Sequence, residues 1–369
     1  MLPKIVVLPF HGRLKISREG YRTRDAHVVK ELTKLGYALE VVSRPEPFPR
    51  LTLAGIRPSS STGRNDLVRW IDREVLSFPP VRDRQAWWAR SSAYYDDLPP
   101  GDVLLSFHPF LPDEVQDWKT SGRRVAFDLL DDLTVHPQFS GVGDAVTTAY
   151  ERTLSIADTV SCNSLHTAAL VTRISHHDPI VVHNGWTSQS SPLIDGRTGT
   201  RQRVGYGGKL TSRFDVETFE AVARKLPHVQ FVVCGQPIDS VVVSRLRKSR
   251  HVKYLGDLPY TQYIDEVRRW DCALVPHIDG QGFVGGDLIK IYEYRALGLP
   301  VVAYRNREIN PSVSGVFFAE PASLDVVVAD VLDQYGRPGG NRMEWLDAGQ
   351  HSWRQRVDSL ITAHDLAER

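Results

Sequence analysis

The last third of the sequence combines two glycines with three charged side chains at helical spacing. Gly285 and Gly286 come directly before a run that predicts a helix. Glycines at a helix start let an anion approach backbone N–H groups that have no partner inside the helix. Asp287, Lys290 and Glu293 recur at intervals of three residues and therefore share one helix face. This pattern suits a nucleoside diphosphate, with the lysine at phosphate and the glutamate at ribose hydroxyls. An ordinary amphipathic helix with solvated ion pairs is the alternative.

A second candidate anion site follows the strand predicted over 204–206. The loop there carries Gly207, Gly208, Lys209 and Arg213, at the phosphate-binding corner of a Rossmann-like domain. An arginine can bind a diphosphate through two N–H groups, while a lysine adds a compact charge. The loop lacks the G-x-G-x-x-G spacing, so it is not a dinucleotide fingerprint. A plain polar loop is the alternative.

Candidate groups for a second substrate follow strands of the N-terminal half. The loop after the first strand holds His11, Gly12 and Arg13, and His108 follows a later strand. Gly12 would let the chain approach a donor phosphate, and its two neighbours could meet donor or acceptor. For a lone histidine such as His108, a structural hydrogen bond is the alternative.

Three carboxylates stand near the end of another predicted strand: Asp128, Asp131 and Asp132. Such a group could orient an acceptor hydroxyl or serve as a general base. Capping of a turn or helix is the equal alternative.

A repeating strand–loop–helix pattern positions these motifs. In the first half, strands are predicted over 4–8, 37–42, 102–107, 124–129, 159–162 and 180–182, and helices over 25–35, 64–78, 112–121 and 144–156. In the second half, strands are predicted over 204–206, 230–234, 252–255, 272–276 and 300–303, and helices over 214–225, 260–269, 287–297 and 352–366. Such alternation is typical of parallel sheets with right-handed crossovers. It predicts one α/β domain over 1–185, an aperiodic linker over 186–203 and a second domain over 204–349.

Composition limits the class of protein. The 369 residues are 41% hydrophobic and 24% charged, which is ordinary for a globular chain and enough for two domains. The net charge of +1 argues against a dedicated nucleic-acid binder. Three widely spaced cysteines without a C-x-x-C motif indicate reduced thiols.

Targeting signals are lacking in the sequence. No apolar run approaches the roughly 18 residues of a membrane span, and the N-terminal run is too short for a signal peptide. We therefore expect a cytoplasmic protein, with peripheral contact at the inner face of a membrane left open. The aromatic segment 86–95 is expected to pack as a helix, and a patch facing a membrane or an acceptor is the minority interpretation.

The two anion motifs, in this order, resemble the C-terminal domain of GT-B glycosyltransferases. The closer resemblance is to family-4-like bacterial enzymes that make teichuronic acid and related exopolysaccharides. The stretch 287–302 is similar to their N-P-L-K-L-Y-E-Y-L-A-A-G-K-P-V-V helix, and 205–215 to their G-Y-x-G-x-L-x-x-R-F-D loop. In the first half, 24–27, 127–132 and 183–185 are similar to their R-P-x-x-L-A, Y-D-x-x-D-D and P-N-G motifs. The resemblance spans most of residues 1–305.

The resemblance implies a GT-B fold, with two Rossmann-like domains facing across a cleft. A last helix at about 350–369 would return to the first domain. The implied activity is that of a retaining hexosyltransferase, which moves a sugar from a nucleotide-diphosphate sugar to an acceptor hydroxyl. No permanently bound cofactor is implied, and UDP, GDP and dTDP are all open as the nucleotide. No D-x-D triplet occurs in the sequence, which favours cations and a helix start holding the diphosphate without a metal.

Roles follow from the resemblance position by position. Lys209 and Arg213 would stabilise the leaving diphosphate, Glu293 would bind ribose and Tyr260 would flank the nucleobase. The glycines at 207–208 and 285–286, with Asp287 and Lys290, complete the predicted donor site. The predicted catalytic residues are Lys209, Arg213, Asp131 and His108. The predicted acceptor residues are His11, Arg13, Arg24, Asp128 and Asp132.

Two departures from the family leave the donor sugar open. Gly285 stands where many members have a glutamate, and Asp287 replaces the usual asparagine. An inverting route would need a general base, for which Asp131 or Asp132 is the candidate. The acceptor could be a glycan, a lipid-linked glycan or a small molecule.

Two other functions share this fold. A nucleotide-sugar 2-epimerase would need acid and base groups in the donor cleft, where His277 and Asp279 are the only obvious ones. A non-catalytic nucleotide-sugar-binding protein is the third possibility.

Overall fold

Runs of β-branched and other apolar residues form two parallel sheets in the computed structural model. The structure describes residues 1–13, 16, 23–48, 67–72, 74–76, 83–95, 97–186, 201–278, 280, 284–336 and 351–367. The chain divides into unit 1, with Met1–His183, Val284–Gly286 and Trp353–Arg369, and unit 2, with Asn184–Phe283 and Asp287–Ser352. Most of the linker predicted over 186–203 lies outside the described residues.

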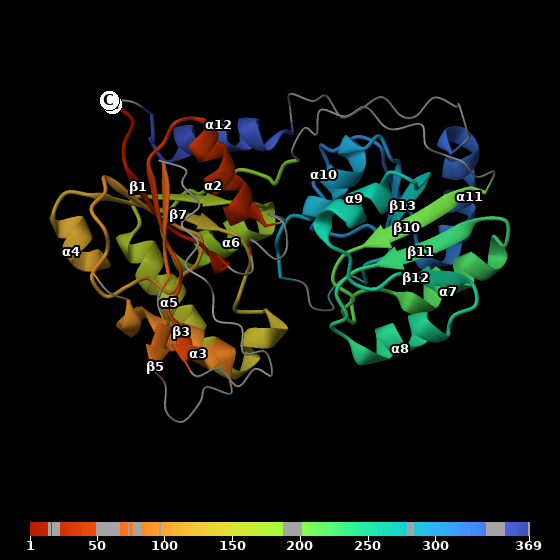
Figure 1. Cartoon of the computed structure of the whole chain (residues 1–369), viewed down its shortest axis with the longest axis horizontal. Coiled ribbons are helices and arrows are strands. Elements are labelled where there is room, and N and C mark those ends of the chain that lie inside the picture. Colours follow the sequence, from red (N-terminus) through yellow and green to blue (C-terminus); the bar gives the residue numbers. More distant parts are fainter. Residues whose placement is uncertain are drawn as a thin grey trace. The chain divides into compact units, whose positions relative to one another are not determined.

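Unit 1 is built on a seven-stranded sheet of order β4-β2-β1-β6-β7-β8-β9. Figure 1 labels β1 and β7 of this sheet. Its strands are β1 (Ile5–Leu8), β2 (Leu39–Val42), β4 (Val68–Ile71), β6 (Val103–Ser106), β7 (Arg124–Leu129), β8 (Thr159–Cys162) and β9 (Ile180–Val181), and β3 (Glu46–Phe48) pairs separately with β5 (Glu74–Leu76). Its helices are α2 (Arg24–Lys34), α3 (Arg84–Arg90), α4 (Val115–Thr120), α5 (Gly143–Ile156), α6 (Leu165–Ile174) and α12 (Trp353–Ala363), with 3-10 turns η1 (Ser91–Tyr94) and η2 (Pro137–Val142). The central strands β1 and β6 are buried along their whole length, as parallel strands between helical layers must be.

Unit 2 is built on a six-stranded sheet of order β12-β11-β10-β13-β14-β15. Its strands are β10 (Arg203–Gly207), β11 (Gln230–Cys234), β12 (Val252–Tyr254), β13 (Cys272–Val275), β14 (Val301–Ala303) and β15 (Val316–Phe318). Its helices are α7 (Val216–Lys225), α8 (Ser240–Lys248), α9 (Tyr260–Val267), α10 (Ile289–Ala296) and α11 (Leu324–Tyr335), with the 3-10 turn η3 (Pro321–Ser323). Because all pairs are parallel, the carboxyl ends of β10, β11 and β13 meet at one edge of the sheet.

The last helix, α12, packs on unit 1 as the resemblance implied, and it lies beside α2 (Figure 1). Trp353 stacks on His27 with ring centroids 4.6 Å apart, and Val357 and Leu360 join the core beneath α2. Just beyond the helix, burial lowers the pKa of His364 to about 4, so the ring is neutral among its hydrogen bonds to β8.

The helix predicted over 64–78 is wrong where the structure describes that stretch, because β4 and β5 lie there. β4 pairs in parallel with β2, and Arg69 forms an ion pair with Glu40 on that neighbouring strand. The partner that decides the conformation is thus distant in sequence, where local periodicity cannot show it. Several elements, among them β3, α6, α8 and β15, are missing from the sequence-based prediction. The start of α6 did carry a signal, since Ser164 and Thr167 form a reciprocal cap.

The aromatic segment over 86–95 packs as predicted. Trp87 and Trp88 of α3 are 5% and 8% exposed and join the core cluster that contains Phe139. These two tryptophans therefore stabilise unit 1, while Tyr94 of the same segment stacks on Trp87 and is 40% exposed. Among the described residues, no helix has the length and apolar character needed to span a membrane.

Candidate functional site

The carboxyl end of β10 carries two glycines that let other side chains approach the backbone. A Cβ atom at Gly207 would lie 2.3 Å from the Tyr263 ring, and one at Gly208 would lie 2.4 Å from Lys290 Nζ. Gly208 also has a φ of +146°, which L side chains rarely adopt. The Tyr294 hydroxyl accepts a hydrogen bond from Gly207 N at 2.9 Å. Lys290, which projects from α10, therefore lies directly against the loop that follows β10.

The Lys290 ammonium belongs to a chain of hydrogen bonds. Its Nζ donates to Tyr206 Oη at 3.0 Å and lies 4.4 Å from the centroid of that ring. Tyr206 Oη lies in turn 2.9 Å from His277 Nε2. Burial, and then the nearby charge of Arg213, lower the pKa of Lys290 to about 7. An anion bound beside Nζ would favour the charged lysine and raise this pKa again.

Two buried nitrogens near this lysine have no hydrogen-bond partner in the described part of the chain. They are His277 Nδ1 and Arg213 Nε. Burial lowers the pKa of His277 well below its usual value, so the ring is neutral. The Tyr206 hydroxyl has one proton, which can go to Lys209 O at 3.3 Å or to His277 Nε2 at 2.9 Å, and this choice sets which ring nitrogen of His277 carries the imidazole proton. Unpaired buried polar atoms are rare, and Arg213 Nε, which can only donate, suits a ligand that brings acceptor oxygens.

Glu308, which the sequence analysis did not identify, holds Arg213 in place. Arg213 Nη2 donates to a Glu308 carboxylate oxygen, and Glu308 is only 2% exposed. The backbone of this loop is also fixed, since Leu288 N donates to Glu308 O at 3.0 Å just before α10. The two partners are 95 residues apart in the sequence, and no local motif signals their contact.

Glu293 lies one turn after Lys290 on α10 and is fixed by two tyrosines of α9. Tyr260 Oη donates to Glu293 Oε1 at 3.1 Å, and Tyr263 Oη donates to Oε2 at 3.3 Å. The Lys209 side chain is exposed, and its charge contributes to the lowered pKa of Lys290. The predicted residues that gather at this edge of unit 2 are Gly207, Gly208, Lys209, Arg213, Tyr260, Lys290 and Glu293.

Asp287 does not share the helix face predicted for it, because α10 begins only at Ile289. Its carboxylate accepts hydrogen bonds from Asn184 N and from Tyr292 Oη, each at 2.7 Å, and Asn184 Nδ2 donates to Asp287 O at 2.8 Å. The structure thus places Asp287 as a buried anchor for the chain at Asn184.

Gly285 and Gly286 belong to unit 1 and not to the first turn of α10. A Cβ atom at Gly285, whose φ is +79°, would lie 2.1 Å from the His166 ring, and one at Gly286 would lie 2.4 Å from Asp131 Oδ1. Ser164 Oγ donates to Gly285 O. The structure places both glycines in tight packing against the carboxyl ends of β7 and β8.

The loop after β1 is organised by a buried carboxylate. His11 N donates to Asp25 Oδ2 at 2.8 Å, and His11 Nδ1 lies 3.2 Å from the same oxygen. Burial would raise the pKa of Asp25, but the charge and hydrogen bonds of His11 bring it well below the usual range. Arg13 forms an ion pair with Asp72 at 3.5 Å. The space beside Gly12 is open among the described residues, since a Cβ atom there would have only Glu46 Oε1 within 4 Å, at 3.8 Å.

His108 is completely buried. Phe110 N donates to its Nδ1 at 3.2 Å, so the imidazole proton lies on Nε2, which is 3.3 Å from Tyr95 Oη. Burial lowers the pKa of His108 well below its usual value. The structure therefore places this predicted catalytic residue in a hydrogen-bonded core position.

Arg24 and Asp128 form a bidentate ion pair inside unit 1. Arg24 Nε and Nη2 donate to the two carboxylate oxygens at 2.7 and 3.1 Å, and Ser161 Oγ donates to Asp128 at 2.7 Å. Asp128 is 0% and Arg24 3% exposed. Arg24 and Asp128, both predicted to bind the acceptor, thus neutralise each other and share hydrogen bonds inside the fold.

The two remaining aspartates follow β7. Asp132 is 1% exposed and caps a turn, since its Oδ1 accepts a hydrogen bond from Thr134 N at 2.9 Å. Its Oδ2 lies 3.5 Å from His166 Nε2, another residue that the sequence analysis did not identify. Asp131 is half-buried beside Gly286. No group of three or more His, Cys, Asp or Glu suited to a metal ion occurs within the described ranges.

Comparisons with known proteins identify the fold. No protein-family model and no curated protein matches the sequence. Among solved structures, the chain is similar to an α,α-trehalose-phosphate synthase (UDP-forming) from Burkholderia vietnamiensis, with 14% identity, a TM-score of 0.65 and coverage of 99% of this chain and 98% of that one. It is also similar to a glycosyltransferase involved in avilamycin A biosynthesis, with 13% identity, a TM-score of 0.57 and coverage of 100% of this chain and 99% of that one. A third similar structure is Anabaena HepE in complex with UDP and glucose, with 14% identity, a TM-score of 0.55 and coverage of 99% of this chain and 96% of that one. The chain therefore has the two-domain α/β GT-B fold that the sequence predicted. The finer likeness to family-4-like and teichuronic-acid enzymes stays a prediction.

The buried Arg24–Asp128 pair yields a stability prediction. Arg24→Met leaves a buried carboxylate without its cation, and we expect a loss of about 3–5 kcal/mol in the free energy of unfolding. Arg69→Met removes an exposed partner of Glu40 and should cost less than about 1 kcal/mol. Urea unfolding of both variants checks this. Equal losses would contradict the structural role, and Arg24→Met with Asp128→Leu should recover most of the loss.

Proposed function

We propose that this protein is a glycosyltransferase that moves a sugar from a nucleotide-diphosphate sugar to an acceptor hydroxyl. The observation that carries the proposal is the cationic cluster against Gly208. There Lys290 has lost water without a carboxylate at ion-pair distance among the described residues, and two buried nitrogens beside it lack hydrogen-bond partners there. A diphosphate supplies both the negative charge and the acceptor oxygens that these groups need.

The same groups suit the chemistry of transfer. When the bond between the anomeric carbon and the diphosphate oxygen breaks, negative charge grows on the leaving diphosphate. Cations that are already in place stabilise that charge without reorganising. Arg213 is held by Glu308 and Lys290 by Tyr206, so both are fixed before the donor binds. We assign leaving-group stabilisation to these two side chains and to Lys209, without a metal ion.

The nucleoside would bind next to the diphosphate. The Glu293 carboxylate, held by Tyr260 and Tyr263, can accept hydrogen bonds from ribose hydroxyls. UDP is the first nucleotide to test, because two similar structures are described as UDP-forming or as bound to UDP and glucose. We propose a hexosyl donor.

The acceptor would bind to unit 1, at the loop that carries His11 and Arg13. Asp25 fixes the orientation of His11, while Arg24 and Asp128 are occupied with each other. We propose retention of the anomeric configuration, as the resemblance implies.

The alternative functions have less support. An epimerase would need His277 and Asp279 as acid and base groups. His277 is buried with a lowered pKa, and Asp279 lies outside the described residues. A binding protein without activity would use the same nucleotide site. Release of free nucleotide separates the three functions, because only a transferase releases it in response to an acceptor.

Removal of the Glu293 carboxylate should abolish recognition of ribose. Calorimetry with UDP, GDP, dTDP and ADP first identifies the nucleotide, which at 100 times its Kd should stabilise the protein by about 2.7 kcal/mol. We expect its 2′,3′-dideoxy analogue to bind about tenfold more weakly, which is about 1.4 kcal/mol. Glu293→Ala should bind both nearly equally, and the control Glu217→Ala should keep the difference. A difference that persists in Glu293→Ala would exclude the ribose role, and no binding of any nucleotide would refute the donor site.

Donor affinity should fall as the pH rises through 7. Lys290 must be charged to bind the diphosphate, and its pKa is lowered to about 7, so binding takes up a proton above that pH. Titrations with UDP-glucose between pH 6 and 8.5, in buffers of different ionisation enthalpy, should show this uptake. Lys290→Met should bind at least tenfold more weakly, about 1.4 kcal/mol, and without pH dependence. An unchanged pH profile in Lys290→Met would assign the proton to another group.

Sugar transfer should give a product whose new glycosidic linkage has a single anomeric configuration. Incubation of the donor with candidate glycan, lipid-linked and small-molecule acceptors should release free nucleotide only when the right acceptor is present. NMR of the product then gives the configuration of the new linkage. An inverted linkage would refute retention, and a 2-epimer formed from the donor alone would favour the epimerase.

A further inference from the structure

Helix α8, the turn that follows it and the adjoining strand β12 concentrate positive charge. The stretch 236–253 contains Arg245, Arg247, Lys248, Arg250 and Lys253 against a single acid, Asp239. This stretch therefore carries a net charge of +4, although the whole chain carries +1. Such a local excess on a nearly neutral protein favours an anionic partner.

Most of these cations face water. The buried face of α8 consists of Val242, Val243 and Leu246, so the helix is fixed to the sheet by its aliphatic side. Arg245 is neutralised by Glu217 and Glu220. The other four cations are exposed, and no carboxylate of the described residues forms an ion pair with them. We call them the α8 cations: Arg247, Lys248, Arg250 and Lys253.

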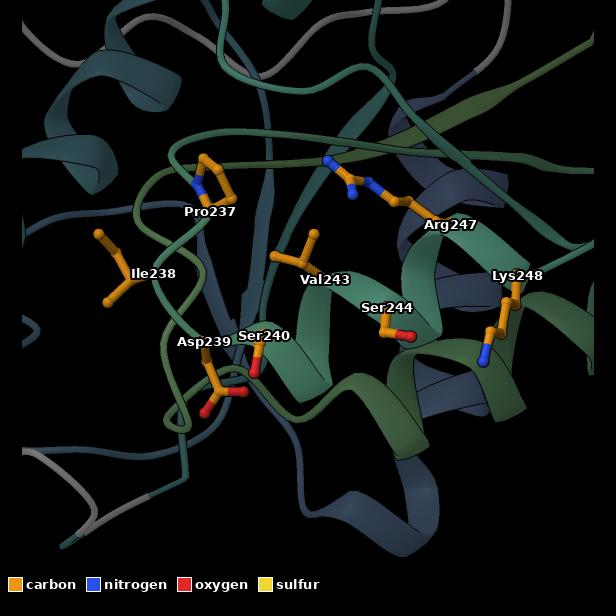
Figure 2. A pocket seen from close by; sticks show the side chains of 8 residues that line it. All are labelled: Pro237, Ile238, Asp239, Ser240, Val243, Ser244, Arg247 and Lys248. Atoms are coloured by element: carbon orange, nitrogen blue, oxygen red, sulfur yellow. The ribbon is translucent and has the colours of Figure 1, made fainter. Parts of the chain in front are cut away.

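Aliphatic side chains accompany the α8 cations on the exposed side. Val241 is 73% and Ile238 48% exposed, at the start of the helix and in the loop before it. A shallow hollow of about 380 Å³ runs from Ile238 to Arg247 and Lys248, and Asp239, Ser240 and Ser244 are among the other residues that line it (Figure 2). The surface thus offers cations, hydroxyls, isolated aliphatic groups and the one carboxylate of Asp239, but no deep apolar groove for a peptide.

We propose that the α8 cations, with Ile238 and Val241, dock unit 2 on an anionic phospholipid surface. Arginine and lysine are attracted by the negative potential of such a surface, and aliphatic groups beside them insert at the boundary between headgroups and acyl chains. An acidic protein fits less well, because it would leave the two aliphatic groups without an apolar pocket. This surface of unit 2 borders the loop that carries Lys209, since Ile238 N donates to Leu210 O at 3.2 Å, but the proposal does not depend on catalysis.

Vesicle sedimentation tests the proposal with the full chain. We expect binding to vesicles of 30% phosphatidylglycerol in phosphatidylcholine and at least tenfold weaker binding to pure phosphatidylcholine. Binding should fall steeply between 50 and 300 mM salt, because the attraction is screened. Replacement of all four α8 cations by Gln should reduce binding at least tenfold, and Ile238→Ser with Val241→Ser should leave a weaker, more salt-sensitive binding.

A matched control removes four exposed cations of unit 1, through Lys30→Gln, Arg90→Gln, Arg123→Gln and Arg354→Gln. This variant should bind anionic vesicles like the parent protein, and unchanged circular dichroism and melting temperature show that all variants fold. Equal binding to both kinds of vesicle would overturn the proposal. So would equal losses in the α8 and control variants, or binding to a soluble polyanion such as heparin without binding to vesicles.

Discussion

The close contact between Lys290 and Gly208 is the constraint on which the rest of the candidate site depends. A side chain at position 208 would occupy the place of the ammonium, which itself anchors Tyr206 and, through it, His277. The same contact sets how α10 meets the end of β10, and Glu293 lies one turn further along that helix. The glycine loop therefore arranges the cation, the hydrogen-bonded chain and the carboxylate at once.

This arrangement costs the ligand-free protein stability. Each buried donor without a partner costs roughly 1–3 kcal/mol. The half-buried Lys290 ammonium has a lowered pKa, so its contacts with Tyr206 replace the lost hydration only in part. A bound diphosphate would supply the missing hydrogen bonds and compensate the lost hydration of the ammonium. Its electrostatic attraction to a poorly hydrated cation is also stronger than its attraction to a cation in water. Arg213 differs from Lys290 in this respect, because Glu308 already neutralises it. We therefore attribute the free energy gained on diphosphate binding mainly to Lys290. The role that we assign to Arg213 is to fix the geometry of the loop.

Local sequence patterns predicted the parts of the site that depend on one strand end or one helix face. A strand followed by glycines and a lysine pointed to the loop after β10, and helical spacing linked Lys290 with Glu293. The same spacing misplaced Asp287, because it cannot show that α10 begins at Ile289 and that Asp287 anchors Asn184 instead. Glu308 was out of reach, since its role comes from a contact across the fold. The helix wrongly predicted over 64–78 has the same origin, a pairing of β4 with the distant β2.

The carboxylates of unit 1 bear on the chemistry that the fold can support. Asp128 and Asp132 are buried and hydrogen-bonded, so neither can take a proton from an acceptor without losing those bonds. His11 is different, because Asp25 keeps its charge beside the ring and would stabilise an imidazolium that forms there. A retaining transferase needs no general base on the acceptor side. The hydrogen bonds that already occupy Asp128 and Asp132 agree with such a mechanism. Were the product inverted, His11 would be a better base than Asp132, one of the two aspartates that the sequence offered for this role.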